Sequence, residues 1–555
     1  MSINPDGNNT KFNWRILTLL TLCGIFISLP FYNYLPLLIQ GDVGHNLYSF
    51  KKTLEGGVPY KDYFWNYGPL MPYYYAACFK LFGVQISSII LGKTFLNLLS
   101  GILIYLSLIP FIESAVAILA VLWFWTFNTD FMYSFNHFGG VFVILLILYL
   151  ILQYIRKPEQ KWIYLLQPSL LALLLIKINM GVATTISTVI SILIINSTYK
   201  NFGKLQKPVA SLKIFFLPII LSALTYVLLI IKLPTYYILQ CFPFFPGYDQ
   251  FHRSSLAHAF QILAKDILTN ILGNPSLLEP ASTLSQDLSY KIFIMLSTFS
   301  IVCFSYFLIK KDYRKKTPSS TWLIISTVII FILLLSHEFV LSATIYRLGW
   351  VNPLILLFVF FMVGISIKNL KRIYKTIIFL GLIYVIALAI HDKYEFKTGL
   401  TQNPRLFIHL KHTEIYARNP PDWTNTVTKT TSYLKTHLKK NETFLALPYD
   451  PLYYYLTDIS NPIPEHMFFN YLNVPEEQER RIIADMERKN TNYILLSNRS
   501  NSREQGLGQF GKSYCPLLAA YLKNHFKLVE SFGDWNNPAG WAWPHAVRIY
   551  KRITP

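Results

Sequence analysis

The sequence predicts a polytopic α-helical membrane protein with about eleven spans, followed by a C-terminal soluble α/β domain. Three observations support this fold class. Of the 555 residues, 53% are hydrophobic and only 14% are charged, whereas soluble proteins carry about a quarter charged residues. Long uncharged stretches recur through residues 1–391. After His391 the composition changes to that of a globular domain, so the predicted domains are 1–391 and 392–555.

The predicted spans are apolar segments that approach or reach the roughly 20 residues needed to cross about 30 Å of hydrocarbon. In lipid, only a helix satisfies its own backbone hydrogen bonds without an enclosing barrel, so each segment is expected to be helical. The segments are 15–37, 87–110, 114–128, 138–155, 162–177, 180–197, 212–231, 291–309, 321–337, 350–367 and 375–391.

Two long loops, 40–87 and 232–291, connect the first two spans and the seventh and eighth spans. Both contain amphipathic stretches, at 71–82 and 255–272, that suit a membrane surface. Long loops that are not of low complexity usually carry function. We therefore expect the functional residues to lie in or beside these loops.

The net charge of +21 is distributed as in a membrane protein, which argues against a nucleic-acid partner. Residues 1–391 hold 29 Lys and Arg against 13 Asp and Glu, and residues 392–555 hold 21 against 16. The basic excess lies in short loops between alternate spans, which indicates their cytoplasmic side. We predict a multi-pass protein of the cell (inner) membrane, with a cytoplasmic N-terminus and residues 392–555 outside. No small-residue cleavage site follows the first apolar run, so this run is expected to remain as an anchor.

The C-terminal residues alternate strand-like and helix-like segments. The strand pattern occurs at 443–447, 493–497 and 546–550, and the amphipathic helix pattern occurs at 476–489 and 514–526. This alternation is typical of a small α/β layer structure. The five cysteines are scattered and show neither a disulfide framework nor metal-binding spacing.

Asp42 lies a few residues beyond the first span, at the level of the lipid headgroups. A carboxylate there is partly desolvated, so its pKa can rise toward a value that suits a general base. Asp42 also precedes the helical pattern of residues 43–54, where a carboxylate can cap free backbone N–H groups. The residues alone leave both roles open, and the two roles are compatible.

The first loop resembles that of a known family at the level of motifs. An acid just after the first span is followed by Gly56-Gly-Val-Pro-Tyr-Lys-Asp-Tyr-Phe64, then by Gly68-Pro-Leu70, and then by Phe82-Gly83 before the second span. This combination resembles bacterial GT-C glycosyltransferases, the membrane enzymes related to protein O-mannosyltransferases and to the aminoarabinose transferase that modifies lipid A. The remaining spans and the C-terminal residues resemble the family only in architecture.

The resemblance implies an inverting glycosyltransferase, transferring a hexosyl or pentosyl group from a polyprenyl-phosphate donor to a hydroxyl of a lipid, glycan or protein acceptor. In that family the first-loop acid is the catalytic residue, which maps onto Asp42. An outer acid after the third span often assists it, which maps onto Asp130. Members often carry an Asp-Glu pair in the first loop, whereas this chain has Asp42-Val43. We therefore predict no metal ligand and no required cofactor, although the resemblance leaves a divalent metal open.

Three cations at the outer ends of spans are candidates for the donor phosphate. Lys177 ends the fifth span, Arg347 precedes the tenth, and Lys93 lies near the start of the second, where family members often carry Arg. Cations at this depth are costly unless they are paired, which favours a functional role. Guanidinium binds phosphate oxygens bidentately, so Arg347 is the strongest candidate. The alternative is that these long side chains snorkel to the headgroups.

Four further residues are candidates for contact with the acceptor or the sugar, or for catalysis. His137 can hydrogen-bond a sugar hydroxyl, and Tyr60 represents the many aromatic side chains of the first loop, which suit sugar C–H surfaces. Arg253 lies in the second long loop. For His137 the alternative is a structural hydrogen-bond donor, and for Tyr60 it is the interfacial aromatic belt. For Arg253 the alternative is a solvated surface pair with the preceding histidine. For Asp130, the alternative is a solvated turn residue.

A transporter or flippase of a lipid-linked saccharide is the second function considered. Transporters usually show interrupted helices with charges near the midplane and a repeat that relates their halves, and neither pattern is visible in this sequence. A non-enzymatic protein of polysaccharide assembly is a third reading. Convergence of Asp42, Lys177 and Arg347 at the outer face would favour the enzyme, whereas a water-accessible path through the midplane would favour transport.

Overall fold

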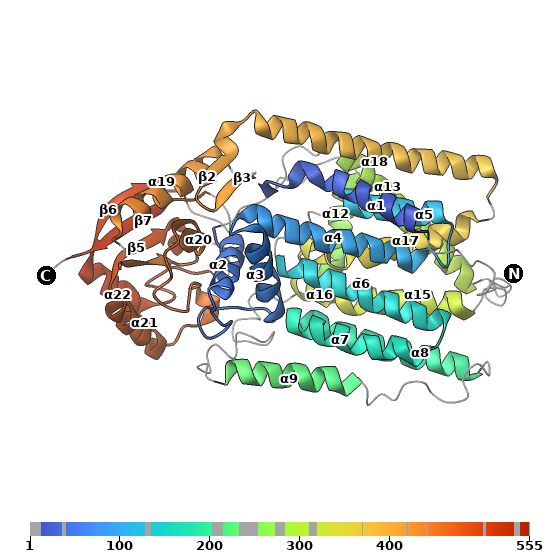
Figure 1. The fold of residues 1–555 in the computed structure, drawn as a ribbon, viewed down its shortest axis with the longest axis horizontal. Helices are drawn as coiled ribbons and strands as arrows, with labels where there is room; N and C mark the ends of the chain where they lie inside the picture. The colour runs from blue at the N-terminus through green and yellow to red at the C-terminus, as the bar shows by residue number, and fades with distance from the viewer. Residues whose placement is uncertain are drawn as a thin grey trace.

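The computed structural model describes residues 13–35, 40–127, 135–201, 215–231, 254–271, 284–309, 319–368, 370–417, 420–439, 441–502, 507–537 and 544–553. The described chain forms a long helical bundle at one end and a mixed α/β region at the other (Figure 1). Asp130 and Arg253, two of the candidate site residues, lie outside the described residues.

Each predicted span overlaps a described helix of the bundle, although the helix of the first predicted span ends at Ser28 and that of the eighth begins at Leu284. These helices are α1 (Trp14–Ser28), α4 (Ile86–Leu108), α5 (Ser114–Phe127), α6 (Phe135–Arg156), α7 (Gln160–Ile176), α8 (Ile178–Asn201), α9 (Phe216–Ile230), α13 (Leu284–Ile309), α15 (Ser319–Leu335), α17 (Asn352–Ile367) and α18 (Arg372–Thr401). Seven helical segments are long and apolar enough to cross a membrane, which indicates a multi-pass membrane protein. The helices α5, α7, α9 and α17 are shorter, so the count of eleven spans stays a prediction.

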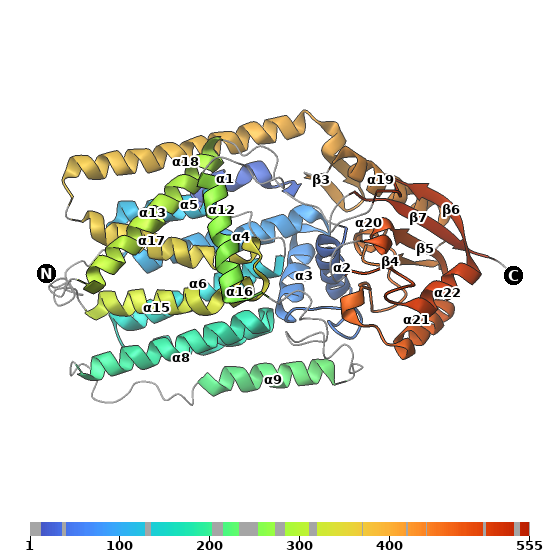
Figure 2. The same cartoon turned by 180° about the vertical axis from the view of Figure 1, so that it is seen from behind.

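The bundle is organised around α6. The spanning part of α6 is 83% buried, whereas those of α1 and α18 are 22% buried. The helices α1 and α18 therefore lie at the periphery, where their exposed apolar side chains face the expected hydrocarbon. From behind, α12 (Leu256–Ile271) lies crosswise to α13 and α15, beside the short helix α16 (His337–Ser342) (Figure 2). Of the second long loop, residues 254–271 and 284–291 are described: the first part is mostly the helix α12, which coincides with the predicted amphipathic stretch, and the second part is the start of α13.

The helix α18 continues without a break to Thr401, past the domain boundary predicted after His391. The polar end of this helix contacts the last turn of α1 and the chain that follows it. Tyr394 donates a hydrogen bond from its hydroxyl to the Phe26 carbonyl at 2.9 Å, and Lys397 donates one to the Asn33 side chain. These contacts extend the helix beyond the apolar run that defined the predicted boundary.

The C-terminal region contains a four-stranded sheet of order β4-β5-β7-β6. Strand β4 (Thr443–Leu447) is parallel to β5 (Thr491–Ser497), and β7 (Val547–Arg552) is antiparallel to both β5 and β6 (Phe526–Phe532). Most residues of β4 and β5 are buried, as expected for strands covered on both faces. The helices of this region are α19 (Pro421–His437), α20 (Leu452–Thr457), α21 (Glu476–Arg488) and α22 (Pro516–His525). The predicted strands and helices of this region are confirmed within a few residues at each end.

The first long loop lies between the bundle and the C-terminal sheet. It contains α2 (Asp42–Leu54), as predicted, and α3 (Leu70–Phe82), and both helices occupy the junction in Figure 1. Just before this loop, β1 (Tyr34–Leu35) pairs in parallel with β3 (Thr413–Ala417), which in turn pairs with β2 (Phe407–Leu410). Residues far apart in the sequence are thereby brought to one end of the bundle.

Candidate active site

Asp42 is the first residue of α2, but it does not cap this helix. The N-cap residue is Gly41, and the described partner of the carboxylate is the hydroxyl of Tyr449, which donates a hydrogen bond to Oδ1 at 2.9 Å. Tyr449 directly follows the β4–Pro448 segment of the C-terminal region. The capping alternative is therefore wrong for the Asp42 side chain, although its place in the first helical turn still suits a negative charge.

Burial and the neighbouring polar groups shift the pKa of Asp42 in opposite directions. The side chain is partly buried, and this burial raises the pKa of Asp42, while the Arg499 guanidinium and the Tyr449 hydrogen bond lower it. Arg499, in the short helix η6 (Asn498–Asn501), is fully buried and donates a hydrogen bond to the Tyr449 carbonyl at 3.0 Å. A carboxylate with raised basicity and residual access to solvent has the properties of a general base.

Two more groups, Asp450 and Tyr471, complete what we call the Asp42 cluster, which consists of Asp42, Tyr449, Asp450, Tyr471 and Arg499. The Ser497 hydroxyl donates to Asp450 Oδ2 at 2.7 Å, and burial raises the pKa of Asp450 to about 6 despite the opposing charge of Arg499. Burial, followed by the charges of Asp42 and Tyr67, raises the pKa of Tyr471. Asp42 thus shares one buried cation with a second carboxylate.

A second cluster surrounds Lys177, between α7 and α8. The Lys177 ammonium lies 2.6 Å from Glu338 Oε1 and 2.9 Å from His137 Nε2, and both Lys177 and Glu338 are buried. An ammonium can only donate, so His137 Nε2 accepts and the ring proton lies on Nδ1. Arg347, in the short helix η3 (Ile345–Leu348), is close enough to interact electrostatically with Lys177 and Glu338. We call Lys177, His137, Glu338 and Arg347 the Lys177 cluster.

Aromatic rings form the wall of the Lys177 cluster. The indole of Trp350 stacks on the His137 ring with centroids 4.7 Å apart and planes 13° apart, and Lys177 Nζ lies 4.6 Å from its centre. The ring of Tyr67 meets His137 edge-on at 5.8 Å. These contacts keep Lys177 and His137 in fixed positions beneath the first loop.

Tyr67 interacts with both clusters. Its ring contacts His137, and its phenol interacts electrostatically with Tyr449 and Tyr471, which lie beside Asp42. The next residue anchors the loop: the Gly68 N–H donates to the Ile176 carbonyl at 2.9 Å. A Cβ at Gly68 would lie 2.0 Å from the Leu175 carbonyl oxygen, so only glycine allows this approach. Tyr67 of this loop therefore interacts with residues of both clusters.

Two other sequence-predicted residues are engaged in contacts within the protein. Lys93, on α4, lies over the ring of Phe138 at 4.9 Å from its centre. Tyr60 is buried and donates from its hydroxyl to the Tyr67 carbonyl, so it supports the position of Tyr67. The structure therefore groups Lys177, His137 and Arg347 together, whereas Tyr60 contacts the backbone of Tyr67.

Sequence reasoning missed Glu338, Tyr449 and Arg499. Glu338 had a local signal, since it is an acid directly after the apolar run of residues 321–337. Tyr449 and Arg499 had no local signal, because each is an ordinary residue after a strand of the C-terminal region.

Among the described residues, the groups that act on the charge of Asp42 are the Tyr449 phenol and the Arg499 guanidinium, whereas hard divalent cations select several carboxylate or carbonyl oxygens. In the described residues, His391, Asp392 and Glu395 come within metal-binding distance of one another, on the part of α18 beyond its apolar run.

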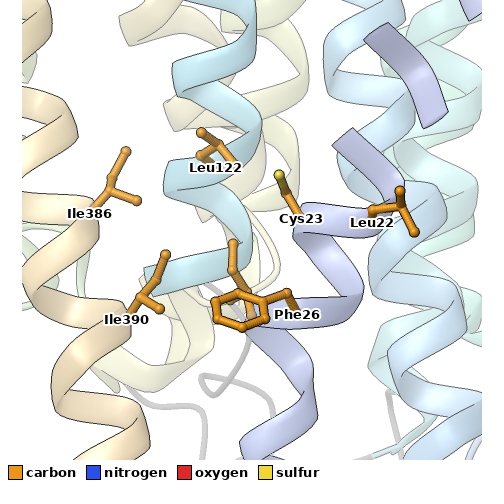
Figure 3. A pocket seen from close by; sticks show the side chains of 7 residues that line it. Leu22, Cys23, Phe26, Leu122, Ile386 and Ile390 are labelled. Carbon is orange, nitrogen blue, oxygen red and sulfur yellow. The ribbon is translucent and has the colours of Figure 1, made fainter. Parts of the chain in front are cut away.

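A pocket of about 350 Å³ lies elsewhere in the bundle, between α1, α5 and α18 (Figure 3). It is lined by Leu22, Cys23, Phe26, Ile27, Leu122, Ile386 and Ile390. This lining offers no acid, base or cation, so the pocket suits hydrocarbon and not the chemistry of sugar transfer.

Comparisons with known proteins give only distant likenesses. No protein-family model matches the chain. No curated protein matches it either. Among solved structures, the chain is similar to the archaeal oligosaccharyltransferase AglB from Archaeoglobus fulgidus, in complex with an inhibitory peptide and a dolichol-phosphate, at 10% identity and a TM-score of 0.49. That likeness covers 96% of this chain and 74% of AglB.

Two further solved structures have similar scores. ArnT from Cupriavidus metallidurans bound to undecaprenyl phosphate matches at 10% identity and a TM-score of 0.44, covering 96% of this chain and 97% of ArnT. The arabinofuranosyltransferase AftD from Mycobacteria matches at 12% identity and a TM-score of 0.44, covering 98% of this chain and 40% of AftD. At these identities and scores, the likenesses assign neither a family nor an activity to this chain.

Proposed function

We propose that this protein is an inverting glycosyltransferase that moves a sugar from a polyprenyl phosphate to an acceptor hydroxyl at the outer face of the cell membrane. The observation that carries the proposal is the opposite charge of the two clusters, both of which interact with Tyr67. The Lys177 cluster holds the cations Lys177 and Arg347 against one acid, Glu338. The Asp42 cluster holds two acids against one cation.

The chemistry of transfer needs both charges. Asp42 takes the proton of the acceptor hydroxyl as the hydroxyl oxygen attacks the anomeric carbon of the sugar. The bond from that carbon to the phosphate oxygen breaks in the same displacement, which inverts the anomeric configuration. The departing lipid phosphate gains negative charge, and Lys177 and Arg347 stabilise it. The acceptor is a hydroxyl of a lipid, a glycan or a protein.

Position along the chain also supports a membrane-anchored donor. The Lys177 cluster lies at the end of α7, where the Gly68 N–H of the first long loop donates to the Ile176 carbonyl, and the Asp42 cluster lies where α2 of that loop meets Tyr449 of the C-terminal region. Figure 1 shows α2 and α3 of this loop at the end of the bundle that faces the C-terminal region. A lipid phosphate whose tail lies among the spans would reach this level. The charges of the two clusters are thus gathered at one end of the bundle, which is a poor arrangement for the transporter alternative.

The test is a transfer assay with purified full-length protein in proteoliposomes that contain labelled polyprenyl-phosphate-linked sugars and a cell-envelope extract as acceptor. An enzyme releases free polyprenyl phosphate and gives a glycoside whose anomeric configuration, measured by NMR, is inverted. A transporter instead moves the intact labelled lipid to the opposite leaflet. Intact donor that only changes leaflet would overturn the proposal.

A further inference from the structure

The C-terminal region is docked directly on the residues that carry Asp42. The Leu452 N–H donates to the Gln40 carbonyl at 3.1 Å, and the Trp423 indole donates to the Gln40 side chain at 2.8 Å. A Cβ at Gly44 would lie 2.3 Å from the Leu452 nitrogen. The two chain segments therefore touch through their backbones, and the position of Asp42 depends on a region that begins hundreds of residues later.

Arg499 and Tyr449 pack on the same short segment. A Cβ at Gly41 would lie 2.7 Å from Arg499 Nη1 and 2.7 Å from the Tyr449 ring, so both side chains press against the residue before Asp42. The Arg499 guanidinium stays charged at any relevant pH, and full burial of that charge is costly unless acids compensate it. Asp42 and Asp450 are the acids whose charges interact with it.

We propose that Tyr449 and Arg499 are positioning residues for Asp42, so that the C-terminal region completes the active site instead of forming a separate module. The Tyr449 hydroxyl holds Oδ1 and leaves Oδ2 to accept the proton. The Arg499 guanidinium keeps the carboxylate ionised in a buried setting. This inference rests on the proposed function for its catalytic meaning, but the pairing of Asp42 with Arg499 is measurable without any substrate.

The charged and titratable groups that face Asp42 predict the direction of the effect. They are Tyr449 from the segment after β4, Tyr471 from η5 (Asn470–Leu472), Arg499 from η6, and His45 and Asp450, which contact or act on Tyr449 and Arg499. Burial lowers the pKa of His45 to about 3, so this ring is neutral near pH 7. Arg499 is therefore the cation that opposes the effect of burial on Asp42. Its removal raises the pKa of Asp42.

The first experiment is a double-mutant cycle on thermal stability, with Asp42→Asn, Arg499→Gln and the combined variant of the full-length protein. If Asp42 and Arg499 are paired, the loss of melting temperature in the double variant is smaller than the sum of the two single losses. Arg480→Gln removes an exposed arginine of the same region and should combine additively with Asp42→Asn. Additive losses for Asp42 and Arg499 would overturn the pairing, whether or not the protein transfers sugar.

The second experiment is the pH profile of polyprenyl phosphate release in the proteoliposome assay. Arg499→Gln should move the acidic limb upward by about 1 pH unit or more, because a neighbouring arginine typically lowers a carboxylate pKa by that amount. Arg499→Lys should restore most of the wild-type profile. Tyr449→Phe keeps the packing and should move the limb in the same direction by less, which provides a test if Arg499→Gln does not fold.

The outcomes separate the two proposals. Wild-type protein that releases no polyprenyl phosphate would contradict the proposed function, while the stability cycle would still decide the pairing. Active wild-type protein with an unshifted acidic limb in both Arg499→Gln and Tyr449→Phe would show that these residues serve only folding.

Discussion

The two charged clusters at the end of the bundle that faces the C-terminal region differ in their charge balance and in their construction. In the Lys177 cluster, two cations share one acid, and Lys177, His137 and Glu338 come from helices of the bundle or from their ends. In the Asp42 cluster, two acids share one cation, and Asp42 meets Tyr449 across 407 residues of sequence. One cluster is therefore local to the membrane region, whereas the other exists only when the C-terminal region docks.

In the proposed reaction, this difference separates stabilisation of the departing phosphate from activation of the acceptor hydroxyl. An excess positive charge fixed among the spans suits a phosphate whose lipid tail lies in the bilayer. An excess acid at the junction with the C-terminal region suits an acceptor that arrives from outside the membrane. Four changes test this division.

The largest expected effect comes from Asp42→Asn. Asparagine keeps the size of the side chain and an oxygen for the Tyr449 hydrogen bond, but it cannot take a proton. Turnover should fall by about 10²–10⁴-fold, as is typical when a general base is removed. The assay is release of polyprenyl phosphate, with melting temperature as the check on folding. The control is Asp422→Asn, at an exposed acid of α19. Near-normal turnover in Asp42→Asn would show that Asp42 is not the general base.

Lys177→Met tests whether the buried pair is a true structural unit of the membrane region. The change leaves Glu338 buried without its nearest cation, and breaking a buried pair costs about 3–5 kcal/mol. The melting temperature in detergent should therefore fall clearly. The matched control is Lys161→Met, which breaks an exposed pair with Glu159 and should cost at most about 1 kcal/mol. Equal losses in the two variants would contradict the burial argument.

Asp450 should give the Asp42 cluster a distinct pH dependence of stability. Its pKa rises from 3.8 to about 6 on folding, so the folded state binds more protons than the unfolded state between these values. Stability attributable to Asp450 is highest below pH 3.8 and decreases by up to about 3 kcal/mol as the pH rises to about 6. Melting temperatures of wild type and Asp450→Asn should be compared from pH 4 to 7. Parallel curves for the two proteins would rule out this assignment.

The smallest effect is expected from Arg347→Ala, because Lys177 remains to hold the phosphate. Loss of a hydrogen bond to a charged group costs about 1.5–3 kcal/mol, so the KM for the lipid donor should rise by about tenfold or more. Acceptor dependence should stay unchanged. Arg156→Ala, at the opposite end of α6, is the control. A donor KM that does not move in Arg347→Ala would separate Arg347 from phosphate binding.

Much of the helical framework was predictable because its signals are local. An apolar run of about 20 residues must be helical in lipid wherever it occurs, so each predicted span corresponds to a described helix. The helix at 43–54 and the strand at 443–447 could also be predicted from a local signal, the short-range pattern of apolar and polar residues. The helix α18 continues past the boundary predicted after His391 because composition marks where the apolar layer ends, whereas a helix ends where its backbone hydrogen bonds end.

Only some residues of the candidate site could be predicted from the sequence. The sequence by itself placed Asp42, Lys177 and Arg347 near the ends of spans, since an ionisable residue at such a position stands out against apolar neighbours. Tertiary structure alone decided that Tyr449 and Arg499 meet Asp42 and that Glu338 balances Lys177. The physical reason is that a buried charge is stabilised by whichever partner the fold brings within a few ångströms, and sequence separation carries no information about that distance.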